Sequence, residues 1–137
     1  MPKVLIADEL SPKALEIFRG RGVEADVRPG LKKAELIRII AGYEGLAVRS
    51  ATKADKEVIA AATRLKVIGR AGIGVDNIDV VAATAGGIVV MNTPFGNSIT
   101  TAEHAIALLF AAARQIAAAD ASTQAGKWEK SRFMGVE

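Results

Sequence analysis

The stretch LKVIGRAGIGVDN, residues 65–77, joins a short apolar strand to a glycine-rich turn. Gly69, Gly72 and Gly74 lack a Cβ, so the backbone there can turn sharply, tolerate φ > 0 and approach a ligand closely. Arg70, inside the turn, carries a planar set of N–H donors that suits a carboxylate or a phosphate. The combination predicts a small-anion site at the carboxyl end of a strand.

The same stretch does not match the glycine fingerprint of dinucleotide-binding folds. That fingerprint needs a third glycine where Asn77 stands, and it needs an acidic residue about 20 positions further along, which is missing. These residues therefore predict an anion site without a pyrophosphate cradle.

Short apolar runs alternate with helical patterns through the first 97 residues. Strands that are separated by helices predict an α/β fold with a five-stranded parallel sheet and right-handed crossovers. The runs that favour strands are residues 3–7, 23–27, 45–48, 65–68 and 88–91, and the helical patterns lie near 12–20, 31–40, 54–62 and 78–85.

Loops that carry polar or glycine-rich sequence follow the last three of these strands. They are Arg49-Ser50, the turn from Arg70 to Gly74, and the segment 92–97. Ligands of parallel α/β sheets bind outside the carboxyl ends of the strands. The shared location of these loops therefore favours a binding site on one rim of the sheet.

A long apolar helix is expected after the fifth strand and its loop. Thr100 and Glu103 form a capping-box pair that predicts the start of this helix, which then runs to about Ala119. Apolar residues lie on nearly every side of it, so it should be buried on every side, and one sheet domain covers only one. We therefore expect residues 98–137 to begin a second, incomplete region.

Composition excludes several classes of protein. Half of the residues are apolar but only 4% are aromatic, so the core must be built from Ala, Val, Ile and Leu. The chain has no cysteine and His104 is its only histidine, which excludes a thiolate or histidine metal site and cysteine catalysis. The net charge of +3 is spread over interspersed charges, which suits acidic metabolites and not nucleic acid.

The N-terminus is no signal peptide and no clean membrane span follows, so we expect a cytoplasmic protein without a membrane partner.

Several charged residues also have simpler interpretations. Arg49 and Arg70 can each pair with a nearby acid on the surface, but their joint placement on one rim favours a site. Asp76 is expected to cap a helix or hold a turn, and His104 to serve packing or an interface.

Asp8 and Glu9, after the first strand, are also typical of a phosphorylation receiver domain. That domain needs an aspartate where Arg49 stands and a lysine where Asn92 stands. The receiver interpretation is therefore rejected.

Five blocks of sequence together resemble the D-2-hydroxyacid dehydrogenases. They are VRSAT at 48–52, the glycine-rich run at 69–77, MNTP with GNS at 91–98, AEHA at 102–105 and GKWE at 126–129. The blocks occur in the family's order and spacing. The resemblance implies that residues 1–97 form most of a flavodoxin-like substrate-binding domain, with helices on both faces of its sheet. Residues 98–137 would begin the nucleotide-binding and dimerisation region of a homodimer or higher homo-oligomer, through a long helix that crosses to a missing nucleotide-binding domain.

The resemblance also implies roles for individual residues. The substrate would be a small phosphorylated hydroxy acid, whose phosphate meets side chains and whose carboxylate meets backbone amides of the glycine-rich turn. Ile73 would lie beside the nicotinamide of NAD, which oxidises the 2-hydroxyl group of the substrate to a keto group. The substrate-binding residues implied in this way are Arg49, Ser50, Arg70, Ala71, Gly72 and Gly74.

One departure from the family limits what this chain is expected to do alone. The family's dinucleotide loop and its catalytic Arg, Glu and His follow a segment like Trp128-Glu129, and none of them occurs before Glu137. We therefore expect no catalytic residue, no hydride transfer and no tight NAD binding by these 137 residues. The alternative is a non-catalytic flavodoxin-like binding module that self-associates through the helix after Thr101.

Overall fold

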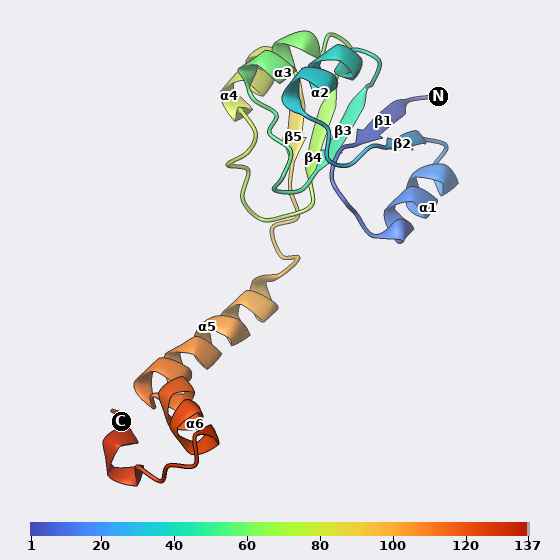
Figure 1. Ribbon diagram of the computed structural model, residues 1–137. Helices are drawn as coiled ribbons and strands as arrows, with labels where there is room; N and C mark the ends of the chain where they lie inside the picture. Colours follow the sequence, from blue (N-terminus) through green and yellow to red (C-terminus); the bar gives the residue numbers. More distant parts are fainter. Residues whose placement is uncertain (137) are drawn as a thin grey trace. The chain divides into compact units, whose positions relative to one another are not determined.

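The computed structural model describes residues 1–136, which form two compact units that divide after Gly96 (Figure 1). The first unit holds a five-stranded sheet in which every pair of neighbouring strands is parallel, in the order β2-β1-β3-β4-β5. This order is that of flavodoxin-like sheets, so the predicted five-stranded parallel sheet is confirmed. The strands are β1 (Lys3–Ile6), β2 (Glu24–Val27), β3 (Gly45–Val48), β4 (Val67–Arg70) and β5 (Val89–Met91).

Four helices connect these strands. They are α1 (Pro12–Gly20), α2 (Lys33–Ile40), α3 (Lys56–Ala61) and α4 (Val80–Ala85). Asp55 begins α3 by accepting hydrogen bonds from the backbone N–H groups of Glu57 and Val58, both at 3.1 Å. Asp79 begins α4 in the same way, with the N–H of Ala82 at 2.9 Å. These caps satisfy free amides at the helix starts, so each crossover begins at a fixed residue.

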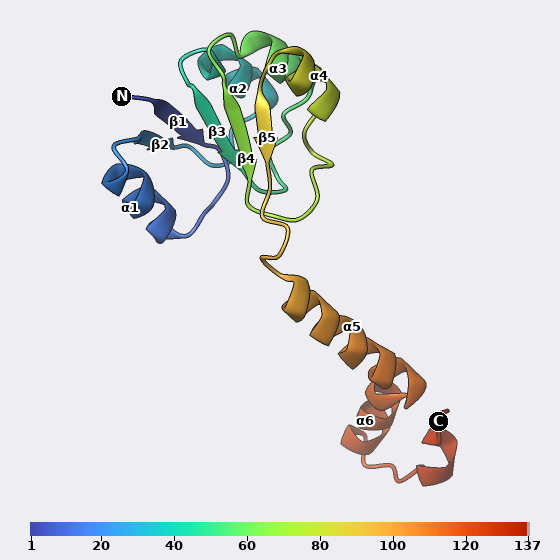
Figure 2. The ribbon, with the colours of Figure 1, turned by 180° about the vertical axis from the view of Figure 1, so that it is seen from behind.

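The hydrophobic core lies on the face of the sheet that α2, α3 and α4 cover, as Figures 1 and 2 show from opposite sides. Leu5, Leu46 and Ile68 are register partners on neighbouring strands, and each is at most 1% exposed. Because all three point to the same side, they form one apolar row beneath the helices. Burial of each side chain contributes about 1.5–3 kcal/mol, which anchors the strands whose ends carry the site.

The opposite face of the sheet is covered only in part by the residues that the structure describes. α1 lies beside β2, apart from the other three helices in both views. Over β5, Val89 and Met91 remain 58% and 54% exposed, and a Cβ added at Gly69 of β4 would meet no atom within 4 Å. Within the described residues of the first unit, no helix lies over β4 and β5 on this face, so the expected helices on both faces are found only in part.

The second unit contains two helices where one was predicted. α5 (Ser98–Ala113) and α6 (Ile116–Gln124) are bent by 62° from each other, and a short 3-10 helix, η1 (Lys130–Phe133), follows. The prediction of a single helix to Ala119 is wrong because Gln115 adopts φ 52°, a left-handed conformation that interrupts the helix.

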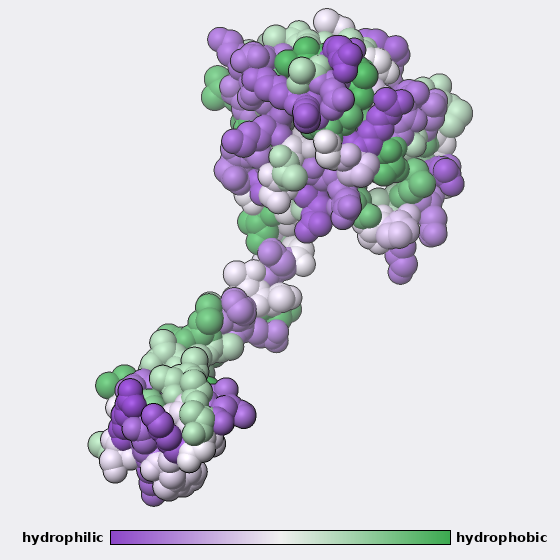
Figure 3. Space-filling model, in the orientation of Figure 1, coloured by the Kyte–Doolittle hydropathy of each residue, from purple (hydrophilic) through white to green (hydrophobic). Residues whose placement is uncertain are grey.

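The predicted capping box is also wrong. The helix begins at Ser98, after Asn97, so Thr100 and Glu103 already lie inside its first two turns, and Asn97 makes no side-chain cap. Within its own unit α5 has no buried residue. Leu108, Leu109 and Phe110 are each more than half exposed, and Figure 3 shows apolar surface along this helix. Most of the apolar surface of α5 is therefore left uncovered by the described residues of its own unit.

No single helix within residues 1–136 is long and apolar enough to cross a membrane. The bent pair α5 and α6 passes that test of length and composition only when the two are taken together.

Candidate functional site

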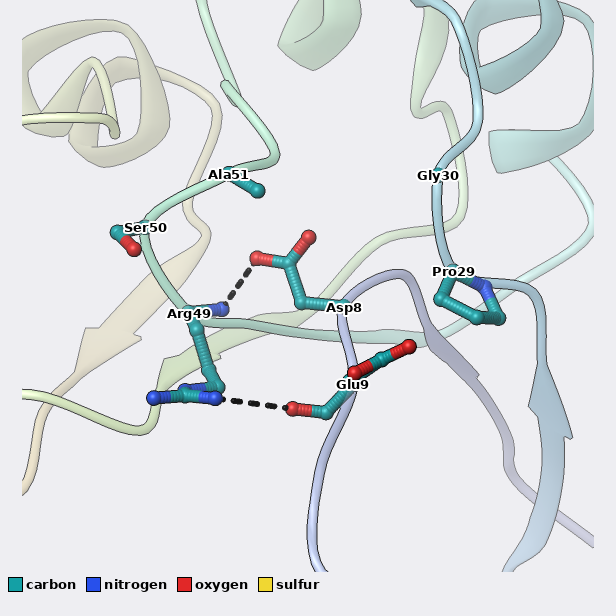
Figure 4. Close-up of a pocket in the computed structure, with 7 residues that line it drawn as sticks. All are labelled: Asp8, Glu9, Pro29, Gly30, Arg49, Ser50 and Ala51. Atoms are coloured by element: carbon teal, nitrogen blue, oxygen red, sulfur yellow. Dashed lines mark hydrogen bonds between the residues drawn. The ribbon is translucent and has the colours of Figure 1, made fainter.

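A cavity of about 450 Å³ opens at the carboxyl end of the sheet, between the loops that follow β1, β2 and β3 (Figure 4). The carboxyl ends of parallel strands lie on the same side of the sheet, so three loops that are distant in sequence meet there. The cavity combines acidic, basic and hydroxyl side chains with exposed backbone. Its lining residues are Asp8, Glu9, Pro29, Gly30, Arg49, Ser50 and Ala51.

Asp8 is buried at the end of β1 and binds the loop that follows β3. Its carboxylate accepts hydrogen bonds from the backbone N–H of Arg49 at 2.6 Å, the hydroxyl of Thr52 at 2.6 Å and the N–H of Thr52 at 3.1 Å. Burial disfavours the charged form of Asp8, but the hydrogen bonds from Thr52, Arg49 and Ala51 outweigh it and lower the pKa of this carboxyl. Asp8 is therefore an ionised acceptor that organises the loop.

Arg49 extends from this loop over the mouth of the cavity. Its guanidinium approaches the backbone carbonyl of Glu9 at 3.5 Å, and Figure 4 shows the side chain pointing toward Glu9. No acidic side chain within residues 1–136 forms an ion pair with Arg49. Ser50 follows it and lines the same cavity. Arg49 is thus a cation available to an anionic ligand.

Arg70 is the last residue of β4 and is the register partner of Val48, directly before Arg49. The structure therefore brings the backbones of the two predicted arginines to neighbouring positions at the carboxyl end of the sheet, although Arg70 and the glycine-rich turn do not line the cavity. The guanidinium of Arg70 contacts the carboxylate of Asp76 at 2.5 Å, and this hydrogen bond lowers the pKa of Asp76. The Arg70 side chain is 12% exposed and that of Asp76 is 84% exposed. Asp76 holds the turn, as the sequence indicated, and it does so through Arg70.

Gly72 and Gly74 leave room for the side chains of Arg70 and Asp76, and none of the three glycines of this turn adopts a left-handed conformation. Gly69, Gly72 and Gly74 are not among the described residues with positive φ, contrary to the conformational reason expected for them. A Cβ at Gly72 would lie 3.3 Å from Nε of Arg70, and one at Gly74 would lie 3.0 Å from the Asp76 carboxylate. Side chains at these two positions would crowd the Arg70–Asp76 pair.

The backbone amides of the turn divide into two engaged and two free donors. The N–H of Ala71 donates to Val48 at 2.9 Å and that of Gly72 donates to Arg70 at 3.0 Å, so these two predicted ligand contacts are already in use. The N–H groups of Ile73 and Gly74 have no partner within residues 1–136. A carboxylate that meets this turn is therefore best served by these last two amides.

Hydrogen bonds to the next loop fix the direction of those free amides. Asn92 donates from its side chain to the carbonyl of Ile73 at 2.7 Å, and the N–H of Thr93 donates to the carbonyl of Gly72 at 2.9 Å. Ile73 itself is 43% exposed, which leaves an apolar side chain at the rim.

Sequence reasoning missed two buried members of the site. Asp8 was rejected as a receiver acid and Asn77 was noted only as a missing glycine, although both are less than 9% exposed. The available signal was an aspartate directly after the apolar run of residues 4–7, since a buried carboxylate needs partners. Within residues 1–136 no cluster of three or more possible metal ligands occurs.

Comparison with known proteins assigns the chain to a family. The model of the D-isomer specific 2-hydroxyacid dehydrogenase catalytic domain matches residues 4–132. The chain belongs to this dehydrogenase family. Among curated relatives in the family, the D-3-phosphoglycerate dehydrogenase of Archaeoglobus fulgidus is 57% identical over 135 residues, which are 98% of this chain and 26% of the relative. The Homo sapiens protein of the same name is 50% identical over 135 residues, again 98% of this chain and 25% of the relative. The chain thus spans about a quarter of the length of these dehydrogenases.

Two solved structures superpose on most of the chain. The TT0316 protein from Thermus thermophilus has a TM-score of 0.83 and 37% identity, with 98% of this chain and 45% of that chain covered. The NAD+-bound 3-phosphoglycerate dehydrogenase in Entamoeba histolytica has a TM-score of 0.73 and 36% identity, with 82% and 39% covered.

Proposed function

We propose that this chain is the substrate-binding part of an NAD-dependent D-3-phosphoglycerate dehydrogenase. The reaction is oxidation of the 2-hydroxyl group of D-3-phosphoglycerate to the keto acid, a step of serine biosynthesis. Relatives with this name at 50–57% identity support the substrate class, and an NAD+-bound structural relative supports the cofactor. The observation that carries the proposal is the placement of Arg49 and Arg70 at the carboxyl ends of the neighbouring strands β3 and β4. The free backbone amides of Ile73 and Gly74 follow in the same turn as Arg70.

The chemistry of the substrate suits these groups. Arg49, Ser50 and Arg70 offer donors to the phosphate, and charge-assisted bonds of this kind contribute about 1.5–3 kcal/mol each before screening by salt. The free amides of Ile73 and Gly74 lie in the same turn and suit the carboxylate. Two anionic groups are thereby held at separate points, which fixes the orientation of the carbon between them.

The residues present fit the nicotinamide end of NAD and not its phosphates. Ile73 presents an exposed apolar side chain next to the free amides, against which a planar ring packs. When bound, NAD accepts the hydride from C2 of the substrate. The 137 residues hold no dinucleotide fingerprint and none of the catalytic Arg, Glu and His that the family resemblance implies after Trp128-Glu129, so we propose that they bind substrate without transferring hydride.

The same proposal covers the organisation of the protein. Residues 1–97 would form the substrate-binding domain, and residues 98–137 would begin the nucleotide-binding and dimerisation region. The exposed apolar side chains of α5 support association with a second copy or with a nucleotide-binding domain. A cytoplasmic location follows from the proposed metabolic role.

Titration of D-3-phosphoglycerate followed by NMR tests the proposal. We expect fast-exchange shifts at residues 49–52 and 69–77 with a millimolar dissociation constant, about −4 kcal/mol. Arg70→Ala should weaken binding by about tenfold or more, because it removes a charge-assisted contact. Arg38→Ala, on the exposed side of α2, is the matched control and should leave binding unchanged.

Two results would contradict the proposal. Shifts that avoid both loops, or that survive Arg70→Ala unchanged, would exclude this anion site. Turnover of D-3-phosphoglycerate with NAD above background would refute the proposed division between substrate binding and hydride transfer.

A further inference from the structure

The buried side chains of Asp8 and Asn77 bind the loop from Arg49 to Thr52 at both of its ends. At each end they bind the backbone N–H group and the backbone carbonyl group. The N–H groups of Arg49 and Thr52 are bound by Asp8, and their carbonyl groups are bound by Asn77. Asp8 is 4% exposed and Asn77 is 8% exposed. A surface loop is ordinarily held by its own turn hydrogen bonds or by water, so a clamp of two buried side chains is a specific feature of this rim.

The geometry of Asn77 admits one orientation of its amide. Nδ2 donates to the carbonyl of Arg49 at 2.8 Å and to that of Thr52 at 2.6 Å, which uses both of its hydrogens. If the amide turned over, Oδ1 would face two carbonyl oxygens. In the observed orientation Oδ1 is buried without a partner, a state that costs folding free energy. The two donors of Asn77 thus hold the loop while one of its buried acceptors stays unsatisfied.

Asn77 also joins the two halves of the proposed anion site. It ends the glycine-rich segment that begins with Arg70, and it binds the loop that carries Arg49. Its backbone carbonyl accepts a hydrogen bond from the N–H of Ala54 at 2.9 Å, so the two loops are connected at a second point. The β3–β4 pairing sets how far Arg70 lies from the start of the loop, and Asn77 sets the course of the loop from Arg49 to Thr52 beyond that point.

We infer that Asp8 and Asn77 are positioning residues of the anion site, which set the direction of Arg49 and Ser50 without contacting the ligand. This inference rests on the proposed function. Asp8 binds the N–H groups of the loop and Asn77 binds its carbonyl groups. Together the two side chains prevent the loop from rotating away from the rim. Figure 4 shows the Asp8 side chain reaching from the end of β1 to the backbone of Arg49.

The test compares Asn77→Ala with Asp79→Ala. The second variant removes the cap of α4 two residues away and destabilises the same neighbourhood, but it makes no contact with the 49–52 loop. Two properties are measured at pH 7: the ¹⁵N relaxation and hydrogen exchange of the Arg49 and Thr52 amides, and the dissociation constant for D-3-phosphoglycerate. Inorganic phosphate serves as a second probe.

If the inference is right, Asn77→Ala increases the mobility of both amides and weakens D-3-phosphoglycerate binding by about tenfold, because a misplaced contact loses most of its energy. Asp79→Ala leaves the loop amides and the dissociation constant within about twofold of the parent, since distant sites are nearly independent. Should Asn77→Ala not fold, Asp8→Asn makes the same test, because it keeps the size of the side chain while turning one acceptor into a donor.

The outcomes separate the inference from the function on which it rests. Parent protein that binds neither probe refutes the proposed function and the inference with it. Parent protein that binds, together with an Asn77→Ala variant of equal affinity and equal loop order, overturns the inference alone. A loss of affinity that Asp79→Ala reproduces assigns Asn77 to stability and also overturns it.

Discussion

Replacement of Thr52 by valine removes a buried hydroxyl whose short hydrogen bond is to the Asp8 carboxylate and whose longer contact, at 3.2 Å, is to the backbone carbonyl of Ala7. Valine has nearly the same size and keeps the backbone N–H bond to Asp8. The hydroxyl, 2.6 Å from the carboxylate, is lost. Thr52 is 8% exposed and Asp8 is 4% exposed, so water does not readily replace the missing donor. Hydrogen bonds to charged groups contribute about 1.5–3 kcal/mol, and we expect Thr52→Val to lower the free energy of unfolding by about 2 kcal/mol at pH 7.

The pH dependence gives this prediction a second, independent readout. A carboxyl whose pKa is lowered in the fold stabilises it above the unfolded pKa of about 3.9, and that stabilisation is lost as the pH falls through the folded pKa. The Thr52 hydroxyl contributes most among the groups that lower the pKa of Asp8, so Thr52→Val raises that pKa. The difference in stability between parent and variant should therefore be largest at neutral pH and should shrink below about pH 4.

Urea unfolding at several pH values measures both effects. Thr84→Val is the matched control, because the hydroxyl of Thr84 is exposed and bonds only to the carbonyl of Val80 within its own helix. We expect it to change stability by less than about 0.5 kcal/mol. Equal effects of the two substitutions, or a Thr52→Val effect that persists unchanged at pH 3, would refute the role assigned to the Asp8–Thr52 bond.

Two further predictions concern the core and the second unit. Ile68→Ala removes a fully buried side chain from the central row of the sheet and should lower the free energy of unfolding by about 2–5 kcal/mol, whereas Val81→Ala at an 82% exposed position should have little effect in the same urea experiment. Sedimentation at micromolar concentration should show self-association that Leu109→Glu reduces, because Leu109 is 62% exposed on an apolar helix; a monomeric parent protein would contradict this.

The sheet and its site loops were predictable because their signals are local. Val67 and Ile68 lie in an apolar run between a helical pattern and a glycine-rich turn, and such runs favour buried strands whatever else the chain does. The strand boundary was less accurate, since β4 extends to Arg70 and the prediction ended it at residue 68. Arg70 therefore belongs to the strand end and not to the turn.

Features that depend on contacts between distant residues were not predictable in this way. Asp8 and Thr52 lie 44 positions apart, and their bond exists only because β1 and β3 are neighbours in the sheet. No glycine or proline marks the break at Gln115, and the apolar pattern continues on both sides of it. The sequence therefore predicted one uninterrupted helix. The engaged amides of Ala71 and Gly72 likewise depend on how the turn closes on the neighbouring strand.

The contact between Arg70 and Asp76 means that this cation is neutralised before any ligand arrives. An anion that takes Arg70 at the proposed site exchanges places with a carboxylate tethered six residues away, so binding there is an ion exchange and not the capture of a bare charge. The displaced Asp76 would move fully into water and recover its ordinary proton affinity, since the bond from Arg70 is the main cause of its lowered pKa. Added salt weakens both competing pairs at Arg70 together.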